Sequence, residues 1–412
     1  MLYNKEETKK GGGKMSKKRF YVLLAVLLIV TNVFTFFIAN TVSVALPGGK
    51  VIVSREDYQL LNQYKKLFEV AKILESRYVD KVNPSMLLEG ALKGMAGSLQ
   101  DPYTVYMNKK EFAEFMTQTT GTYGGIGIIV AVDQEDHIVV VSPIKNTPGE
   151  RAGIKSGDII LEVNGKKVSG KNLDEAVSMM RGPKGTQVTL TIMRDGKTFT
   201  KTITREIIKL ETVFDYMLPD KIGYIKVTLF DQSTSSDFKK ALERLKKDGM
   251  KGLIIDLRDN PGGLLEECVN IADMLLPKGV IVTTKGRAES QEFYSKGTGL
   301  GMPLVVLVNK GSASASEILA GAIKDRKAGV LVGTTTFGKG LVQTVVNFGD
   351  GTGLKYTIAR YYTPNGTDIQ GKGIEPNYVV ELPKDYTLKD TPDLKGDTQL
   401  IKAYEIIKSE IK

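Results

Sequence analysis

The sequence predicts a layered α/β protein with a small inserted β-rich domain and an N-terminal transmembrane segment. Three observations predict this organisation. An uncharged run extends from Phe20 to Ala39, a hydrophobic period of two begins at Tyr123, and apolar strands alternate with helices from Ile222 onward. The length of 412 residues, with 42% hydrophobic and 25% charged residues, fits a folded protein of two or more domains.

The positive charge of the chain is concentrated at its N-terminus. Residues 1–19 contribute +5 of the formal net charge of +10, and the uncharged run 20–39 follows directly. This run has the length of a bilayer span, and its basic flank favours a cytoplasmic N-terminus. We therefore expect a basic cytoplasmic leader at 1–19 and a membrane anchor at 20–39. Nucleic acid is not expected as a partner.

A cleaved signal peptide is the alternative for the same segment. Ser43-Val44-Ala45 offers a small-x-small cleavage site, although the apolar run is longer than the usual 7–15 residues of a signal peptide. In either case residues 40–412 lie outside the cytoplasm, in the membrane-bound or the secreted form. The glycine run at 11–13 also leaves open whether translation begins at Met1 or at Met15.

Residues 40–117 are predicted to form a helical region. A second helical segment covers Met86 to Leu99, and Asp101-Pro102 then breaks the pattern. The region carries no catalytic signal, so we expect it to serve packing or dimerisation. Apolar residues recur at spacings of three and four along its first helical face: Leu60, Leu61, Tyr64, Leu67, Phe68, Ala71 and Leu74.

Residues 118–207 are predicted to form the small β-rich domain. Asn164-Gly165 and Asp195-Gly196 are hairpin turn signals, and helical stretches at 148–153 and 172–180 interrupt the strands. The expected strands are 126–130, 137–142, 157–165 and 187–192.

Residues 208–385 are predicted to form the layered α/β core. Apolar strands are expected at 222–229, 252–257, 304–308 and 330–333, and helices at 235–247, 264–276 and 315–324. Further strands are expected at 343–347 and 353–361. A C-terminal tail, 386–412, ends in a helix from about residue 397. The single cysteine, Cys268, forms no internal disulfide and fits the core.

Ser314 is the strongest candidate nucleophile. It lies between the strand 304–308 and the following helix, where unpaired N–H groups and the helix dipole favour a developing oxyanion. Ser314-Ala-Ser-Glu317 is also a capping box, which requires no catalysis. Ser312 and Ser316 on the same turn are competing candidates.

Lys339 is the best candidate for a general base. The only histidine, His137, lies far away in a short apolar strand and is expected to be structural, and Ser-Lys pairs are a known alternative to a histidine base. Burial among apolar neighbours can lower the pKa of a lysine enough for this role. Gln343, four residues later, could orient the amine through its amide oxygen.

The segment before Lys339 also resembles a phosphate-binding loop. Gly333 to Lys339 fits Gly-x-x-x-x-Gly-Lys, but Gly340 replaces the required Ser or Thr and a strand follows instead of a helix. The sequence therefore argues against nucleotide binding, and no cofactor or metal is expected.

Two glycine-rich loops could supply backbone N–H groups. The Asp256–Gly263 loop ends in Gly262 and Gly263, and one of these with Ala315 could form an oxyanion hole. In the β-rich domain, a turn with free N–H groups could bind a terminal carboxylate while the strand edge pairs with an extended peptide. This turn comprises Tyr123, Gly124, Gly125, Ile126, Gly127 and Ile128.

From about residue 60 to 385 the chain resembles the carboxy-terminal processing peptidases, the S41 serine proteases with a PDZ domain. The resemblance rests on long motifs in the right order: Asp101-Pro-Tyr-Thr-Val-Tyr-Met, Tyr123–Gly127, Gly182-Pro-Lys-Gly-Thr, Asp256-Leu-Arg-Asp-Asn-Pro-Gly-Gly, Ser312-Ala-Ser-Ala-Ser-Glu, Gly338-Lys-Gly-Leu-Val-Gln and Tyr362-Thr-Pro-Asn-Gly. It implies a ClpP/crotonase-like core with an inserted PDZ domain.

The resemblance also implies roles for single residues. Ser314 would be the nucleophile, because the 25-residue spacing to Lys339 matches the family pattern and selects it over Ser312 and Ser316. Lys339 would be the base and Gln343 its orienter. Asp325 corresponds to an acidic position that looks structural, and Arg181 is a candidate for coupling the PDZ domain to the active site, since family members are commonly gated.

The expected function is that of a membrane-anchored serine endopeptidase whose PDZ domain binds the apolar C-terminal tail of protein substrates. A tail-binding scaffold without turnover is the alternative from another class. A homodimer through the N- and C-terminal helices is expected as a further partner. The sequence does not identify the physiological substrate or the activating signal. It also does not decide between sporulation signalling and envelope quality control.

Overall fold

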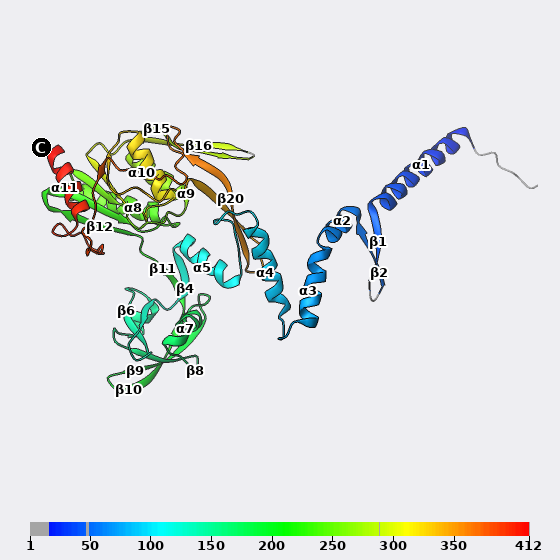
Figure 1. The fold of residues 1–412 in the computed structure, drawn as a ribbon, viewed down its shortest axis with the longest axis horizontal. Helices are drawn as coiled ribbons and strands as arrows, with labels where there is room; N and C mark the ends of the chain where they lie inside the picture. Colours follow the sequence, from blue (N-terminus) through cyan, green and yellow to red (C-terminus); the bar gives the residue numbers. More distant parts are fainter. Residues whose placement is uncertain (1–15, 47–48, 288, 412) are drawn as a thin grey trace, which may run out of the picture. The chain divides into compact units, whose positions relative to one another are not determined.

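The computed structural model describes residues 16–46, 49–287 and 289–411 (Figure 1). The chain divides into two compact units, which meet in sequence between Leu92 and Lys93. The predictions for the basic leader before residue 16 and for the start at Met1 or Met15 lie outside the described residues.

The first unit contains one long apolar helix. Helix α1 covers Lys17–Asn40, and its part from Lys17 to Phe36 is long and apolar enough to cross a membrane, a test that a signal sequence near an N-terminus also passes. Helices α2 (Arg55–Gln63), α3 (Lys65–Arg77) and most of α4 (Pro84–Gly97) follow.

The region 40–117, predicted to be helical, begins with two strands. Strands β1 (Thr41–Leu46) and β2 (Gly49–Ser54) pair in antiparallel orientation. Both segments are rich in β-branched residues, which favour strands over helices. Ser54 then accepts the Asp57 N–H at 3.0 Å and begins helix α2.

In the second unit, the β-rich domain forms an antiparallel sheet in the order β10-β9-β7-β6-β5. Asn164-Gly165 and Asp195-Gly196 have positive φ angles, as the predicted hairpin turns require. Helices α6 (Pro148–Arg151) and α7 (Leu173–Met180) and the 3₁₀ turn η1 (Gly170–Asn172) interrupt the strands. The strands are β5 (Ile128–Val132), β6 (Ile138–Pro143), β7 (Ile159–Val163), β8 (Lys166–Lys167), β9 (Gln187–Arg194) and β10 (Lys197–Thr204).

Two short strands lead into and out of this domain. Helix α5 (Lys109–Thr120) ends at Gly121, whose φ of 66° turns the chain into β4 (Thr122–Gly125). Strand β4 pairs with β11 (Glu206–Lys209), which returns the chain to the core.

The core is a six-stranded sheet in the order β12-β13-β14-β17-β18-β21, and only its β12–β13 pair is antiparallel. Its central strands are mostly apolar because helices cover both faces. The strands are β12 (Val213–Leu218), β13 (Ile222–Val227), β14 (Gly252–Asp256), β17 (Leu304–Val308), β18 (Val330–Gly333) and β21 (Tyr378–Val379); η2 (Pro219–Lys221) joins the first two.

Alternate residues of the core strands face different helices. Leu253 and Ile255 pack with α8 (Thr234–Lys247), α9 (Leu265–Leu275) and α10 (Ala315–Asp325). Ile254 packs on the other face with α11 (Thr398–Glu410), the C-terminal helix in Figure 1. The predicted layered α/β core and its helices are therefore confirmed.

A second, antiparallel sheet has the order β16-β15-β20-β19, with β3 (Val105–Met107) added to β20. The sequence predicted β19 (Leu341–Asn347) and β20 (Gly353–Tyr362). It did not reveal the hairpin of β15 (Pro277–Gly286) and β16 (Ser290–Thr298), whose pairing is broken by register shifts.

Candidate active site

Ser314 occupies a strained turn between β17 and α10. Its φ of 54° and ψ of −113° are unusual for a residue with a side chain and cost about 1–3 kcal/mol. The surrounding structure must hold this conformation in place. A serine on a sharp strand-to-helix turn presents its hydroxyl outward, which is the geometry of a nucleophile elbow.

The two neighbouring serines have structural hydrogen bonds. The Ser312 hydroxyl donates to the Leu257 carbonyl oxygen at 2.8 Å, and the Ser316 hydroxyl donates to the Asn260 carbonyl oxygen at 2.9 Å. Both serines are fully buried, whereas Ser314 lines a cavity of about 590 Å³. Of the three hydroxyls, only that of Ser314 is available to a substrate.

The capping box expected at this turn is present. A carboxylate oxygen of Glu317 accepts the Ser314 N–H at 3.0 Å, as a capping box requires. The Glu317 N–H also donates to the backbone carbonyl oxygen of Ser314 at 2.9 Å. The capping box uses the Ser314 hydroxyl as an acceptor, so its O–H can still donate to another group.

Glu317 is a residue that the sequence reasoning considered only as a cap. Its fully buried carboxylate accepts four hydrogen bonds, which join the Ser314 turn to the Lys339 loop. Besides the Ser314 N–H, the donors are the Thr336 hydroxyl at 2.6 Å and the N–H groups of Gly338 and Lys339 at 2.7 and 2.9 Å. One carboxylate thus fixes the distance between the two backbone segments of the site.

Lys339 lines the same cavity as Ser314. Its Nζ lies over the ring of Tyr103, 4.5 Å from the ring centroid, and makes no hydrogen bond to Ser314. Burial and then the neighbouring charge of Lys355 lower the pKa of Lys339, while Asp101 and Glu317 act in the opposite direction. A lowered pKa increases the neutral fraction that a general base requires.

The region 40–117, for which packing or dimerisation was expected, also contributes residues beside Lys339. Tyr103 carries the Lys339 ammonium, and Asp101 anchors the strand opposite it by accepting the hydroxyls of Thr104 and Thr357, both at 2.6 Å. The sequence of Asp101-Pro-Tyr-Thr indicated the end of a helix and resembled a family motif. No local pattern indicated that this segment contacts Lys339 and Thr357, which lie more than 200 positions away.

Gln343 also lines the cavity, on strand β19. Its amide nitrogen lies 3.5 Å from the Thr357 hydroxyl, the same hydroxyl that donates to Asp101. The amide therefore belongs to the network beside Lys339 and is not bonded to the lysine in this arrangement.

Of the two candidate oxyanion glycines, the structure is incompatible with Gly262 as the donor. Its N–H already donates to the Asn260 side-chain oxygen at 2.8 Å. The N–H groups of Gly263 and Ala315 have no hydrogen-bond partner among the described residues, and both residues line the cavity beside Ser314. Gly262 has a steric role instead, because a Cβ there would lie 2.8 Å from the Ser314 Cβ.

The rest of the cavity wall is mainly apolar. Helix α5, the loop into α9 and strand β19 contribute most of these side chains. The wall suits an apolar segment of polypeptide. Its apolar side chains include Phe112, Phe115, Met116, Leu229, Leu264, Leu265, Ile318, Leu341, Val342 and Val345.

In the β-rich domain, Arg181 contacts the predicted carboxylate-binding turn. The Arg181 guanidinium lies over the ring of Tyr123 at 4.7 Å, and the Gly182 N–H donates to the Gly124 carbonyl oxygen at 3.0 Å. Gly125, Ile126 and Gly127 are buried, and Ile128 begins strand β5. Arg181 therefore lies beside the turn, and no contact among the described residues links it to Ser314 or Lys339.

Asp325, His137 and Cys268 have local structural contacts. Asp325 accepts the Asn365 N–H at 3.0 Å, and His137 contacts Asp133 at 3.1 Å on the surface of the β-rich domain. The buried Cys268 donates its thiol to the Ala315 carbonyl oxygen at 3.1 Å, and burial raises its pKa. Among the described residues, no group of three or more His, Cys, Asp and Glu could hold a metal ion.

Three family models match this chain. They are peptidase family S41 over residues 221–380, the PDZ domain over 139–194, and the N-terminal domain of the activating protease CtpB over 43–111. The matches follow the observed division into core, β-rich domain and N-terminal helical region.

Curated relatives match most of the chain. A carboxy-terminal-processing protease of Bartonella bacilliformis is 40% identical over 393 residues, which cover 85% of this chain and 90% of the relative. A probable CtpA-like serine protease of Staphylococcus aureus MRSA252 is 39% identical and covers 89% of this chain and 73% of the relative. Among solved structures, a photosystem II D1 C-terminal processing protease is 31% identical, with a TM-score of 0.46 and coverage of 84% and 96%.

Proposed function

The chain belongs to the carboxy-terminal-processing serine peptidases of family S41, which carry a PDZ domain, and from that premise we propose that it hydrolyses peptide bonds through a Ser314–Lys339 dyad. The observation that supports this best is the strained Ser314, whose hydroxyl shares a cavity with the partly desolvated Lys339. A strained residue of this kind is retained where its conformation is useful.

In the proposed mechanism, neutral Lys339 removes the proton from the Ser314 hydroxyl as Oγ attacks the scissile carbonyl carbon. The N–H groups of Gly263 and Ala315 stabilise the oxyanion. Lys339 then donates the proton to the leaving amine, which gives an acyl-enzyme on Ser314, and water hydrolyses this ester by the same proton transfers. Metal and nucleotide are not needed for these steps.

Lys339 must change its side-chain direction for this reaction. Nζ now lies over Tyr103, and catalysis requires it within hydrogen-bond distance of the Ser314 hydroxyl. We assign Gln343 the role of holding the amine in that second position. The described arrangement is then a resting state, and substrate binding would favour the active one. Arg181 is the proposed coupling residue for this change.

We assign substrate recognition to the PDZ domain. The turn from Tyr123 to Ile128 would bind the C-terminal carboxylate of a protein tail through its N–H groups, with the tail paired to a strand edge. The mainly apolar cavity beside Ser314 would accept the segment that is cleaved. Residues 118–207 would form the PDZ domain, 208–385 the peptidase core and 386–412 the tail.

Helix α1 supports an extracytoplasmic site of action. We propose that residues 20–39 anchor the protein in the membrane with the peptidase outside the cytoplasm, and a secreted protein after signal cleavage is the alternative. Mass spectrometry of the native protein distinguishes the two, because cleavage removes residues before about 46.

Homodimerisation remains a prediction. One face of α11 packs against the core, whereas α2 and α3 have exposed apolar side chains that could form the dimer contact.

A fluorogenic peptide with an apolar free C-terminus tests the proposed function on the full chain in detergent. We expect turnover in the wild type and a loss of about 1,000-fold or more in Ser314→Ala and Lys339→Ala. Circular dichroism should show an unchanged fold in both variants. A protein that binds the tail peptide but shows no turnover would instead be the tail-binding scaffold.

A further inference from the structure

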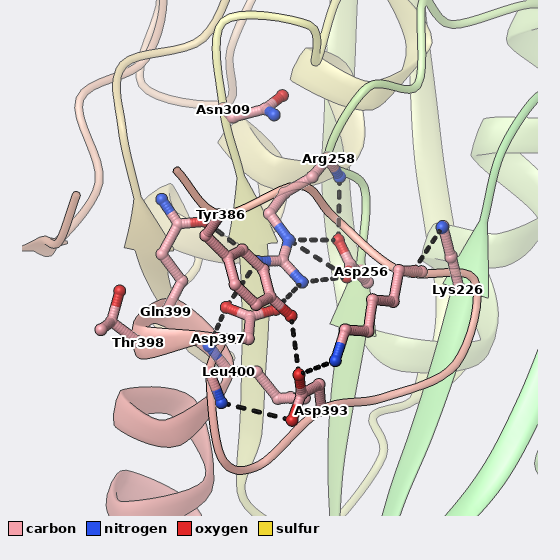
Figure 2. Close-up of polar contacts among 12 residues, drawn as sticks. Lys226, Asp256, Arg258, Asn309, Tyr386, Asp393, Asp397, Thr398, Gln399 and Leu400 are labelled. Atoms are coloured by element: carbon pink, nitrogen blue, oxygen red, sulfur yellow. Dashed lines mark hydrogen bonds and ion pairs between the residues drawn. The ribbon is translucent and has the colours of Figure 1, made fainter. Parts of the chain in front are cut away.

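A buried arginine lies at the start of the loop that ends in the oxyanion glycines. The Arg258 side chain is 3% exposed, and it is directed toward the C-terminal segment of the chain (Figure 2). Asp256 and Asp397 contact it with side-chain exposures of 3% and 4%. The catalytic steps above assign no role to this cluster.

All five guanidinium N–H donors of Arg258 can be satisfied by these neighbours. Nε donates to Asp256 at 2.9 Å, and Nη2 donates to Asp256 at 2.6 Å and to Asp397 at 2.7 Å. Nη1 donates to Asp397 at 2.9 Å and to the Gln399 side-chain oxygen at 3.0 Å. Burial alone would lower the pKa of Arg258, but the two carboxylates raise it above its ordinary value.

Asp397, the second carboxylate that binds Arg258, belongs to the C-terminal tail. Asp397 precedes helix α11 and accepts the Leu400 N–H at 2.9 Å, so the helix N-terminus stabilises the second carboxylate. The Tyr224 hydroxyl donates to Asp256 at 2.7 Å and so gives the first carboxylate a further hydrogen bond. The cluster therefore joins the end of β14 to the beginning of α11.

The loop that follows Arg258 leads directly to both halves of the oxyanion hole. Two residues later, the Asn260 side chain accepts the Gly262 N–H at 2.8 Å and donates to the Val227 carbonyl oxygen at 2.8 Å. The Asn260 carbonyl oxygen accepts the Ala313 N–H at 3.0 Å and the Ser316 hydroxyl at 2.9 Å. Asn260 thus determines the positions of Gly263 and Ala315 relative to each other.

This loop is not held by regular secondary structure. Asp259, Gly262 and Gly263 have φ angles of 58°, 105° and 139°, all in regions that side chains rarely adopt. Its far end is fixed by Phe230, which hydrogen bonds to Gly262 and Leu264. At its near end, the Asn309 side-chain oxygen accepts the Asp259 N–H at 2.9 Å, and Arg258 adjoins this end through its ion cluster.

A buried ion cluster is a poor means of stabilising a core, because desolvation offsets most of the attraction. It is well suited to fixing one irregular backbone conformation, since an uncompensated charge penalises every alternative. We propose that Arg258 is a positioning residue for the oxyanion hole and that Asp397, in the C-terminal tail, is its anchor. The proposal rests on the proposed function of Ser314, Gly263 and Ala315.

Asp397→Asn in the full chain tests this inference. The variant keeps the shape of the side chain but removes one charge from the cluster. We expect kcat for the fluorogenic peptide to fall about 10- to 100-fold with KM changed less than about twofold, because the transition state alone uses the oxyanion donors. The Ki of a matching peptide boronate, which forms a tetrahedral adduct, should rise in parallel.

Two control variants separate positioning from stability. Ile407→Ala removes buried packing from α11 without touching the ion cluster, so it should lower Tm while kcat per folded enzyme and the boronate Ki stay at wild-type values. Lys389→Met removes an ion pair between a mostly exposed lysine and Asp393 on the same segment, and it should leave Tm, kcat and Ki at wild-type values. A lower Tm in Asp397→Asn with unchanged kcat and Ki would overturn the inference.

If Asp397→Asn does not fold, Gln399→Leu decides the question. It removes one acceptor of Nη1 and leaves the two carboxylates, and we expect a loss of about two- to fivefold in kcat. Wild-type kcat in a folded Gln399→Leu would then count against the positioning role. Failure of the proposed function would appear differently, as turnover that persists in Ser314→Ala whatever the state of Asp397.

Discussion

The backbone N–H of Lys339 donates a 2.9 Å hydrogen bond to Oε2 of Glu317, the same oxygen that accepts the Ser314 N–H at 3.0 Å. The proposed nucleophile and base come from different loops, 25 positions apart, and this shared acceptor holds their backbones together. A buried carboxylate thus sets the backbone geometry of the proposed dyad.

Glu317→Gln should therefore damage both stability and activity. The amide has one acceptor oxygen where the carboxylate accepts four hydrogen bonds, so at least one buried N–H loses its partner. We expect the free energy of unfolding to fall by about 2–4 kcal/mol and kcat to fall about 100-fold. Urea denaturation and peptide turnover measure the two effects. Thr336→Ser keeps the hydroxyl donor and should behave like the wild type.

The activity should depend on the protonation of Lys339. Its base function requires the neutral amine, so kcat/KM should rise with pH through the pKa of Lys339, which burial and Lys355 place below that of a free lysine. Lys355→Met removes a positive charge that lowers this pKa. The pKa of Lys339 then rises, and the ascending part of the pH profile moves to higher pH.

Two further variants check the sign of that shift. Asp101 raises the pKa of Lys339, so Asp101→Asn should move the profile to lower pH. Lys355→Arg keeps the charge and should leave the profile in place. Identical pH profiles in the wild type, Lys355→Met and Asp101→Asn would show that the protonation of Lys339 does not control kcat/KM.

Strain at Ser314 should be measurable as stability. Glycine adopts a φ of 54° at little cost, whereas alanine retains the strain of a side chain. Ser314→Gly should therefore be about 1 kcal/mol more stable than Ser314→Ala, with both variants inactive. Thermal unfolding compares the two variants directly. Equal Tm values would show that the backbone at residue 314 is not strained.

Gly262→Ala should abolish turnover for a steric reason. A Cβ at Gly262 would lie 2.7 Å from the Ala313 carbonyl oxygen and 2.8 Å from the Ser314 Cβ, and the φ of 105° adds strain. We expect kcat to fall about 100-fold or more. Gly301→Ala is the matched control, because its φ is also positive while no atom lies within 4 Å of the added Cβ. It should lose about 1 kcal/mol of stability and keep its activity.

Local sequence patterns predicted much of the fold. Strands β14 and β17 are continuous apolar runs, and the residues Asn164-Gly165 and Asp195-Gly196 specify their turns through positive φ angles. The hairpin of β15 and β16 was missed because its register shifts disturb the alternation of apolar and polar residues. Residues 41–54 were assigned to a helical region although their β-branched residues favour strands.

Prediction of the site was limited by contacts between distant parts of the chain. The strand-to-helix position of Ser314 and the scarcity of histidine pointed to the dyad, but only the hydrogen bonds of Ser312 and Ser316 show why these serines cannot compete. The bond between the Gly262 N–H and Asn260 likewise depends on loop geometry. Tyr103 reaches Lys339, and Asp397 reaches Arg258, through tertiary packing that no local pattern encodes.

The central claim is that Lys339 activates Ser314. Its most direct test is the pre-steady-state acylation rate of the full-length wild type and of Lys339→Ala, measured with a peptide ester and followed by mass spectrometry of the Ser314 peptide. We expect an acyl group on Ser314 in the wild type and a rate lower by about 1,000-fold or more in the variant. Equal acylation rates in the two proteins would contradict the dyad.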